Sequence, residues 1–522
     1  MTAEELIKRR HPMHVRHLKD WEFLRLAFEG GEPWKREALQ KYSIEELDDS
    51  FNLRCERVPN SNYVKHVSDE KRNLLFRQGV KRDFIGPRVP TGAEVTAGGE
   101  ARWLAFNADI DRRGTGREDF AHQIWVWRYL YSWCAVLVDK KGTAKTNEEA
   151  IKKRILPSCA IFTPQNILDW GVDNYGKMRW ILLRESHRLD DDPWAEDEQM
   201  IKESYLLWTR EKWQRITALV READQQREGR TAGKQLSART DIVVAEEEKN
   251  PIGEVPVVIF RDGPHPQDPI IGDNNMLDIA DLAKNILNTR SNLEEQIINT
   301  VYSFLVMSGG DFKITKKKLG PRIGISLPQG GEARWIGADI QAVTYLMQVI
   351  EYNERMIYQK AKLRSGYGEE RRPERMSGVA HHWDSRITND DVADDAADLE
   401  RGETEIDRLF GLWEKIPNIE TEIKYPRNFS VTGTQEQLLI MGQALEQAWP
   451  VEAARELLSE TVKAVMPRRA PEIKKKIDEA IAKWEPLQQK PGRQPVLPSG
   501  FGLNRELGRR GGEGAQSTNS TD

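Results

Sequence analysis

The sequence lacks most of the features that identify exported, membrane-spanning or disulfide-bonded proteins. Its 522 residues include three cysteines, Cys55, Cys134 and Cys159, whose spacing matches neither a disulfide framework nor a thiolate metal site. No apolar run is long enough to cross a bilayer, and the first residues lack the basic and apolar segments of a signal peptide. We therefore expect a protein that contacts no membrane and is made and used without export.

Motifs for enzymatic chemistry are also missing. The chain contains no phosphate-binding GxxxxGKS/T loop, no HExxH pair and no GxSxG turn around a nucleophilic serine. His11, His14 and His17 lie close together, but no cluster of acidic or cysteine ligands accompanies them. We therefore expect no cofactor and no metal, and we predict that the protein is not an enzyme.

An excess of positive charge is absent as well. The formal net charge is -5, although charged residues make up 31% of the chain. Proteins that hold DNA by neutralising its phosphates usually carry a basic surface. The charge balance argues against a sequence-specific DNA-binding protein, and it fits a surface past which DNA slides without adhering.

What the sequence does contain is a pair of long amphipathic segments. Apolar residues recur at helical spacing over residues 275–303 and again over 338–364, which predicts two helices. Between them, residues 304–307, 323–327 and 333–336 have the composition of short strands. A hairpin of this kind has little to bury its apolar faces against in an isolated monomer, so we expect an oligomer in which neighbouring hairpins pack. The side chains expected to be largely buried only in that oligomer are Leu282, Ile286, Leu346 and Ile350.

The segments before the hairpin indicate a mixed α/β body. Residues 1–86 show helical periodicity, and residues 103–260 alternate between helical and strand patterns. Cys134 lies in an apolar run there and is expected to be a small core residue. Residues 220–250 are polar and predict an exposed hairpin tip or a disordered loop.

The segment after the hairpin is dense in acidic residues. Residues 388–415 predict a long helix with an apolar side, and a loop rich in glycine, arginine and glutamate precedes it at 365–375. The acidic residues of this helix are Asp390, Asp391, Asp394, Asp395, Asp398, Glu400, Glu403, Glu405 and Asp407. Two interpretations stay open: a solvated face, or an acidic wall along a channel that keeps DNA from adhering.

The C-terminal part is expected to return to the body and then to become helical. Strands are expected at residues 419–425 and 429–431, and helices at 435–449, 452–465 and 471–484. From residue 486 onward proline, glycine, arginine, serine and threonine dominate, which is typical of a disordered tail.

This order of segments, with the stretch Met376-Ser377-Gly378-Val379-Ala380 between the loop and the acidic helix, resembles the portal proteins of tailed bacteriophages. The resemblance implies an elongated α+β subunit with an α/β wing, a two-helix stem, a small β-containing clip and a helical C-terminal crown. It assigns the wing to residues 1–272 and 388–434, the stem helices to 273–303 and 338–364, the clip to 304–337, the tunnel loop to 365–387, the crown to 435–485 and a disordered tail to 486–522.

The resemblance also implies a function. Portal proteins form a ring, usually of twelve subunits, at one vertex of the virion capsid, and double-stranded DNA enters and leaves through its channel. The implied partners are further copies of this chain, double-stranded DNA without sequence preference, the large terminase subunit, head-completion or adaptor proteins, the major capsid protein and the scaffold. Synthesis would take place in the cytoplasm of a host bacterium. Two alternatives are a minor head or scaffold protein that encloses no DNA, and a DNA-processing enzyme whose site the motifs do not reveal.

Two basic clusters would carry function in such a ring. Lys313, Lys316, Lys317, Lys318 and Arg322 crowd one part of the clip and predict a docking surface for an acidic terminase or adaptor, or for DNA phosphates. The tunnel-loop residues expected along the DNA channel are Arg371, Arg372, Arg375, His381 and His382. Each arginine, repeated around a ring, would form a band of positive charge that contacts phosphates without reading sequence. The alternative for the arginines is a solvent-exposed loop with internal Arg–Glu pairs.

Overall fold

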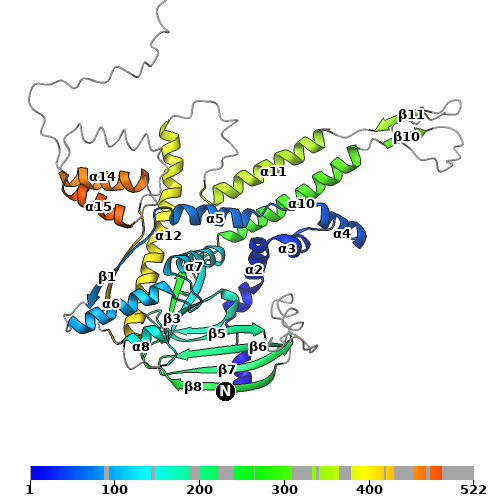
Figure 1. The fold of residues 1–522 in the computed structure, drawn as a ribbon. Coiled ribbons are helices and arrows are strands. Elements are labelled where there is room, and N and C mark those ends of the chain that lie inside the picture. Colours follow the sequence, from blue (N-terminus) through cyan, green and yellow to red (C-terminus); the bar gives the residue numbers. More distant parts are fainter. Residues whose placement is uncertain are drawn as a thin grey trace, which may run out of the picture. The chain divides into compact units, whose positions relative to one another are not determined.

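A computed structural model of the protein describes residues 2–87, 93–142, 147–188, 200–221, 239–263, 265–301, 304–308, 332–336, 340–363, 378–416, 419–427, 451–465 and 471–484. The chain divides into two compact units, Met1–Thr432 and Gly433–Asp522. The larger unit combines helices with antiparallel sheets, which confirms the expected mixture of helix and sheet (Figure 1). No helix within these described ranges is both long enough and apolar enough to span a bilayer.

A five-stranded antiparallel sheet occupies one part of the larger unit. Its strands, in spatial order, are β4 (Ile167–Val172), β5 (Met178–Arg188), β6 (Met200–Thr209), β7 (Lys212–Arg221) and β8 (Thr240–Lys249). The short helix α1 (Ala3–Lys8) packs Leu6 and Ile7 against this sheet. The side chains of β8 are largely exposed, and β8 pairs with β7. For residues 240–249 the expected exposed hairpin is therefore confirmed, and the alternative of a disordered loop is wrong. Residues 222–238 lie outside the described residues.

A smaller antiparallel sheet contains the most deeply buried strand. β2 (Trp133–Asp139) lies between β3 (Ser158–Phe162) and β9 (Val257–Arg261), and all its residues except Asp139 are buried. Because both faces of β2 are covered, its sequence is a continuous apolar run rather than an alternating pattern. Cys134 is buried in this strand, as expected for a small core residue.

Helices from the N-terminal third surround these sheets. They are α2 (Pro12–Glu29), α3 (Gly31–Ala38), α4 (Asp48–Arg57), α5 (Tyr63–Leu75), α6 (Ala93–Ala108), α7 (Arg117–Tyr131), α8 (Asn147–Lys152) and the 3-10 turn η1 (Pro164–Asn166). The helical periodicity of residues 1–86 is confirmed up to α5. Beyond it the chain forms β1 (Lys81–Pro87), which pairs with β12 (Ile419–Lys424) far along the sequence.

The helical hairpin forms where the sequence predicts it. Helix α10 (Met276–Val301) and helix α11 (Ile340–Lys360) pack on each other, and their far ends carry the antiparallel strands β10 (Phe304–Ser308) and β11 (Glu332–Ile336) (Figure 1). The strand expected at residues 323–327 lies outside the described residues.

Helix α12 (Gly378–Trp413) is longer than expected, because it begins ten residues before the predicted start at residue 388. No glycine or proline occurs between Gly378 and Gly402, so nothing in that stretch interrupts helical hydrogen bonding. The assignment of a loop as far as residue 387 is therefore wrong from Gly378 onward. His381 and His382 belong to the first turns of this helix.

Helices α11 and α12 end in the same way. After α11, the Leu363 amide donates to the Tyr358 carbonyl at 2.9 Å, while Lys362 adopts a left-handed φ of 54°. After α12, the Ile416 amide donates to the Gly411 carbonyl at 2.8 Å, while Lys415 adopts a φ of 55°. Both ends are Schellman caps in which lysine occupies the position that usually favours glycine.

Helix α12 crosses β9 at very close range. A Cβ atom at Gly402 would lie 2.0 Å from Cε1 of Phe260, whose ring is buried. Only glycine therefore allows the helix to pack at this distance. The close approach brings the apolar side of α12, including Leu399 and Ile406, into the same core as β2 and β9.

The smaller unit contains the helix pair α14 (Val451–Val465) and α15 (Pro471–Ala482). The helices predicted at 452–465 and 471–484 are thereby confirmed. The helix predicted at 435–449 and the tail from 486 lie outside the described residues.

Candidate functional site

The base of the α10–α11 hairpin belongs to the core of the single chain. Ile286 is 1% exposed and Ile350 is 8% exposed, and both join an apolar cluster with side chains of α2, α3 and α5. Helix α10 reaches this cluster because it packs on α2, α3, α4 and α5 as well as on α11. The expectation that Ile286 and Ile350 are buried only in an oligomer is therefore wrong. Leu282 is partly buried against the same cluster, and Leu346 is partly exposed.

Polar contacts join the hairpin to helix α5. The guanidinium of Arg290 in α10 donates to the hydroxyl of Tyr63 at 3.0 Å and to a carboxylate oxygen of Glu354 in α11 at 3.3 Å. Tyr63 in turn donates to Glu354, and both side chains are buried. Burial raises the pKa of Tyr63, and its hydrogen bond to Glu354 raises it further, so the hydroxyl remains a donor. One arginine thus holds three helices together.

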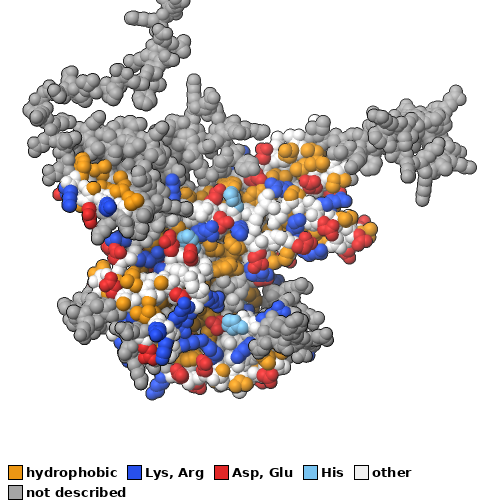
Figure 2. Space-filling model, viewed as in Figure 1, with side chains coloured by type: hydrophobic (Ala, Val, Ile, Leu, Met, Phe, Trp, Pro, Cys, Tyr) orange, Lys and Arg blue, Asp and Glu red, His pale blue; other side chains and the backbone are white. Residues whose placement is uncertain are grey.

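The hairpin also leaves large apolar side chains uncovered. Tyr345 is 67% exposed and Tyr352 is 59% exposed, and Met347 and Ile297 are exposed as well. Tyr345 and Tyr352 lie two helical turns apart, so they share one face of α11. Figure 2 shows hydrophobic side chains gathered over this part of the hairpin. Apolar faces that stay open in a single chain mark interaction sites.

Helix α12 is held by a buried arginine of α7. Arg128, which is 1% exposed, donates to Asp395 and to Asp398, each at 2.6 Å, and to the carbonyl of Arg261 at 3.2 Å. Burial disfavours the charge on this arginine, but Asp395 and Asp262 outweigh burial and raise its pKa. Hydrogen bonds between oppositely charged groups are the strong class, so this contact fixes α12 against α7.

A second buried cluster lies farther along α12. Glu403 accepts hydrogen bonds from Arg82 of β1 at 2.7 and 2.9 Å, from Arg117 of α7 at 3.0 Å and from the hydroxyl of Tyr425. Burial alone would raise the pKa of Glu403, but Arg117 and Arg82 outweigh burial and lower that pKa to about 2. Arg117 also donates to Asp407 at 3.1 Å, where burial dominates and raises the pKa of the carboxyl group. The cluster sets two arginines against two carboxylates inside the core.

These contacts correct both interpretations of the acidic helix. Asp395, Glu403 and Asp407 are buried in ion pairs within the chain. They therefore form neither a solvated face nor a wall along a channel. Asp390 and Asp394 are exposed, and for them both interpretations stay open.

The arginines that hold α12 were missed by the sequence analysis. Arg117 and Arg128 share the buried face of α7 with Ile124, at helical spacing. A charged side chain in the apolar stripe of a helix requires a buried partner of opposite charge. That placement was the available indication that acidic residues elsewhere in the chain would be buried.

Asp391 links the start of this anchored region to the hairpin. Its carboxylate accepts from Lys71 of α5 and from Lys362, which follows α11. Burial raises the pKa of Asp391, but Lys71 and Lys362 outweigh burial and lower it. The hydroxyl of Thr388 also donates to the carbonyl of Lys362 at 2.5 Å. The end of α11 is thereby tied to both α12 and α5.

The N-terminal histidines contribute to packing. His14 is buried, lies edge-on to Trp21 and approaches the carbonyl of Gln165 at 3.4 Å. Burial lowers its pKa to about 3, so the ring is neutral at physiological pH. His11 stacks on Trp170 with ring centroids 3.9 Å apart. In the part of the chain that the structure describes, no group of three or more histidine, cysteine, aspartate or glutamate side chains is placed to hold a metal ion.

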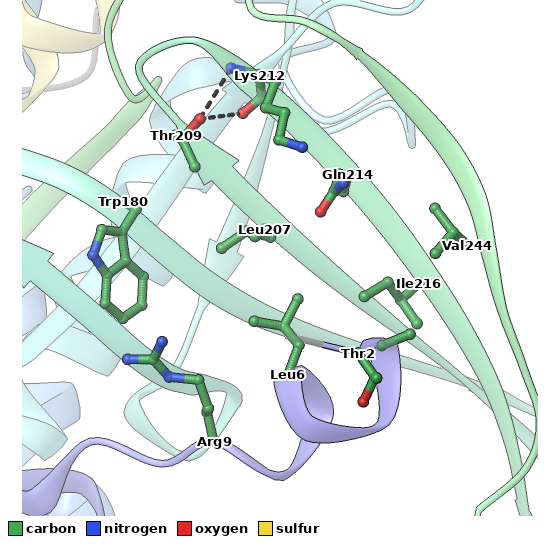
Figure 3. Close-up of a pocket in the computed structure, with 11 residues that line it drawn as sticks. Thr2, Leu6, Arg9, Trp180, Leu207, Thr209, Lys212, Gln214, Ile216 and Val244 are labelled. Atoms are coloured by element: carbon green, nitrogen blue, oxygen red, sulfur yellow. Dashed lines mark hydrogen bonds between the residues drawn. The ribbon is translucent and has the colours of Figure 1, made fainter.

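A cavity of about 390 Å³ lies between α1 and the five-stranded sheet (Figure 3). Leu6 of α1 faces Leu207 and Ile216 of the sheet across it, and the guanidinium of Arg9 lies 4.8 Å from the ring centre of Trp180. The described residues that line it include no carboxylate, histidine or cysteine. The cavity therefore lacks the side chains that most often serve as acid, base or nucleophile.

The basic clusters predicted from the sequence are not placed by the structure. Lys313, Lys316, Lys317, Lys318, Arg322, Arg371, Arg372 and Arg375 lie outside the described residues. Their predicted roles in docking and DNA contact stay predictions.

No protein-family model matches the sequence, and no curated protein matches it. The hairpin, its exposed apolar face and its attachment to the core are therefore the features from which function is inferred.

Proposed function

We propose that this chain is the subunit of a portal ring that conducts double-stranded DNA during packaging and ejection at one vertex of a bacteriophage capsid. The observation that carries the proposal is the division of the α10–α11 hairpin into two parts. Ile286, Ile350 and Ile357 are buried in the core of the chain, whereas Tyr345 and Tyr352 leave another face of α11 exposed. A fixed hairpin with an open apolar face is suited to packing against further copies of itself.

Repetition of one contact between copies would generate the ring. When one surface meets a different surface on the next copy, repetition gives a closed ring if the rotation closes. Aromatic residues are enriched at the centres of protein interfaces, and the exposed face of α11 supplies Tyr345 and Tyr352. Hairpins repeated about one axis would enclose a channel, through which DNA could pass without sequence recognition.

The attachment of α12 supports a passive role for the subunit. The buried pairs of Glu403 with Arg82 and Arg117 hold α12 against β1 and α7. A buried charge left without its partner costs about 3–5 kcal/mol, so the pairs resist displacement of the helix. A rigid conduit of this kind suits a packaging system in which a separate ATPase, the large terminase subunit, supplies the work.

The basic clusters would supply the contacts of the ring with its partners. Lys313, Lys316, Lys317, Lys318 and Arg322 would meet terminase or adaptor proteins, and Arg371, Arg372 and Arg375 would meet DNA phosphates. Reversing the charge of Lys316, Lys317 and Lys318 should abolish packaging while leaving rings intact. Packaging at the level of the unaltered protein would remove the docking role.

Negative-stain electron microscopy of the purified full-length protein tests the proposal. The expected result is a ring with a central hole. A monomer without a hole would overturn it and favour a minor head or scaffold protein. A monomer that cleaves DNA in a nuclease assay would favour the alternative of a DNA-processing enzyme.

A further inference from the structure

A second exposed apolar surface lies where α3 connects to α4. Tyr42, Ile44, Leu47 and Leu53 form this surface, which we call the knob, and Leu47 is 75% exposed. The knob is held in a defined conformation by Arg54, whose guanidinium lies 3.5 Å from the ring centre of Tyr42. These apolar side chains are therefore presented to solvent by an ordered scaffold.

The knob and the exposed face of α11 lie on different sides of α10. On the knob side, the amide of Gln40 donates to Asn288 at 2.8 Å and Arg54 donates to Ser291 at 3.1 Å. On the other side, Arg290 reaches Glu354 of α11. In Figure 1, α4 and α11 accordingly flank α10 on opposite sides. A single chain therefore cannot bring its own two surfaces together across α10.

We propose that the knob of one subunit docks on the hairpin face of the next, where the hairpin face is Tyr345, Tyr352 and Arg355 of α11. The proposal rests on the ring inferred above and names the surface that completes its subunit contact. Because the two surfaces differ, the contact is head-to-tail, and such a contact forms rings when its rotation closes, whereas two-fold dimers need one self-complementary surface.

Charge complements the apolar match. Glu45 and Asp49 accompany the knob, both are exposed, and neither forms an ion pair with another described residue. Arg355 lies one turn beyond Tyr352 on the same face of α11, and it too is exposed without an ion pair in the described part of the chain. A basic group at the rim of one apolar surface and acidic groups at the rim of the other favour one docking orientation.

Two variants of the full-length protein separate the surfaces. The knob variant carries Ile44→Asp and Leu47→Asp, and the hairpin variant carries Tyr345→Glu and Tyr352→Glu. All four side chains are exposed, so the thermal unfolding midpoint of each variant should match that of the unaltered chain. Each variant alone should raise the concentration for half-maximal assembly by about tenfold or more in sedimentation velocity. Tyr175→Glu, at another exposed aromatic residue of the same unit, is the matched control and should assemble normally.

Mixing the two variants provides the decisive measurement. A knob variant retains an intact hairpin face, and a hairpin variant retains an intact knob, so the mixture should form heterodimers that do not close into rings. Failure to form heterodimers, or normal rings from either variant alone, would overturn the docking proposal while the ring itself could stand. An unaltered chain that remains monomeric would instead overturn the proposed function.

Charge reversal covers the case in which the apolar variants unfold. Arg355→Glu should weaken assembly, and combining it with Glu45→Arg and Asp49→Arg should restore it. The docking proposal would be contradicted if the Arg355→Glu variant assembled as well as the unaltered chain, or if the combined variant did not recover assembly.

Discussion

Helix α12 is rich in carboxylates, yet Glu403 and Asp407 are among the most buried side chains of the protein. Helix α11 is rich in apolar residues, yet Tyr345 and Tyr352 face solvent. The difference lies in what surrounds each helix. Arginines and a lysine from α5, α7 and β1 converge on α12, whereas the core covers only one face of α11, the face with Ile350 and Ile357.

This comparison shows that the exposure of a helix depends on its partners as much as on its composition. Buried carboxylates are stable where arginines of fixed position neutralise them. Exposed aromatic residues carry little cost for the folded chain, because folding neither buries them nor leaves a polar group unpaired. The buried helix therefore bears on stability, whereas the exposed face bears on association.

The largest expected effect is on the buried carboxylate of α12. Glu403→Ala leaves Arg82 and Arg117 buried without their shared partner, so it should lower the free energy of unfolding by about 3–5 kcal/mol. Glu405→Ala, two residues away, removes only a surface pair with Arg408 and should cost about 1 kcal/mol or less. Urea unfolding measures the free energy of unfolding of both variants. Equal losses of this free energy would refute the structural role of the buried cluster.

A slightly smaller effect is expected within α11 itself. Ile357→Ala opens a cavity at the fully buried base of the hairpin and should cost about 2–5 kcal/mol. Tyr352→Ala, on the exposed face of the same helix, should change the stability of the unassembled chain by about 0.5 kcal/mol or less. The measurement is chemical unfolding at protein concentrations too low for assembly. A large loss for Tyr352→Ala would mean that this face is covered within the single chain.

Acid should weaken the anchoring of α12. The folded chain lowers the pKa of Glu403 from 4.5 to about 2, so the folded state binds this proton more weakly than the unfolded state does. The resulting stability is present above pH 4.5 and is lost as the pH falls toward 2. The difference in unfolding free energy between the unaltered chain and Glu403→Gln should therefore shrink across this window. A difference that is constant with pH would show that the charge of Glu403 does not matter.

The smallest effect concerns the two lysine caps. Lys415→Gly relieves the left-handed conformation and should stabilise the chain by about 1 kcal/mol. Lys362→Gly relieves the same conformation but removes the ion pair with Asp391, so its gain should be smaller. Thermal unfolding of both variants gives the comparison. An equal gain would indicate that the pair with Asp391 contributes nothing measurable.

The elements that could be predicted from the sequence are those with a local cause. Helices α10, α11, α14 and α15 lie within a few residues of their expected bounds. Their signals, which are the spacing of apolar residues and the glycine or proline residues that end a helix, lie within the segment itself. The start of α12 was placed too late because the acidic run was taken as the beginning of the helix, although no breaker follows Gly378 before Gly402.

The burial of individual side chains could not be predicted in the same way, because it depends on contacts between distant segments. Ile286 is covered by α2, α3 and α5, which precede it by more than two hundred residues. Glu403 pairs with Arg82 and Arg117, 321 and 286 residues away. Periodicity identifies which face of a helix is apolar, but it does not identify the segment that covers that face.

The close packing of α12 on β9 has an evolutionary consequence. Gly402 and Phe260 occupy space that only one of them can fill, since a Cβ atom at 402 would overlap the aromatic ring. During divergence the two positions should therefore change together: a larger residue at 402 becomes acceptable only after the ring at 260 has become smaller. Related chains should show this exchange as covariation between two sites that are far apart in the sequence.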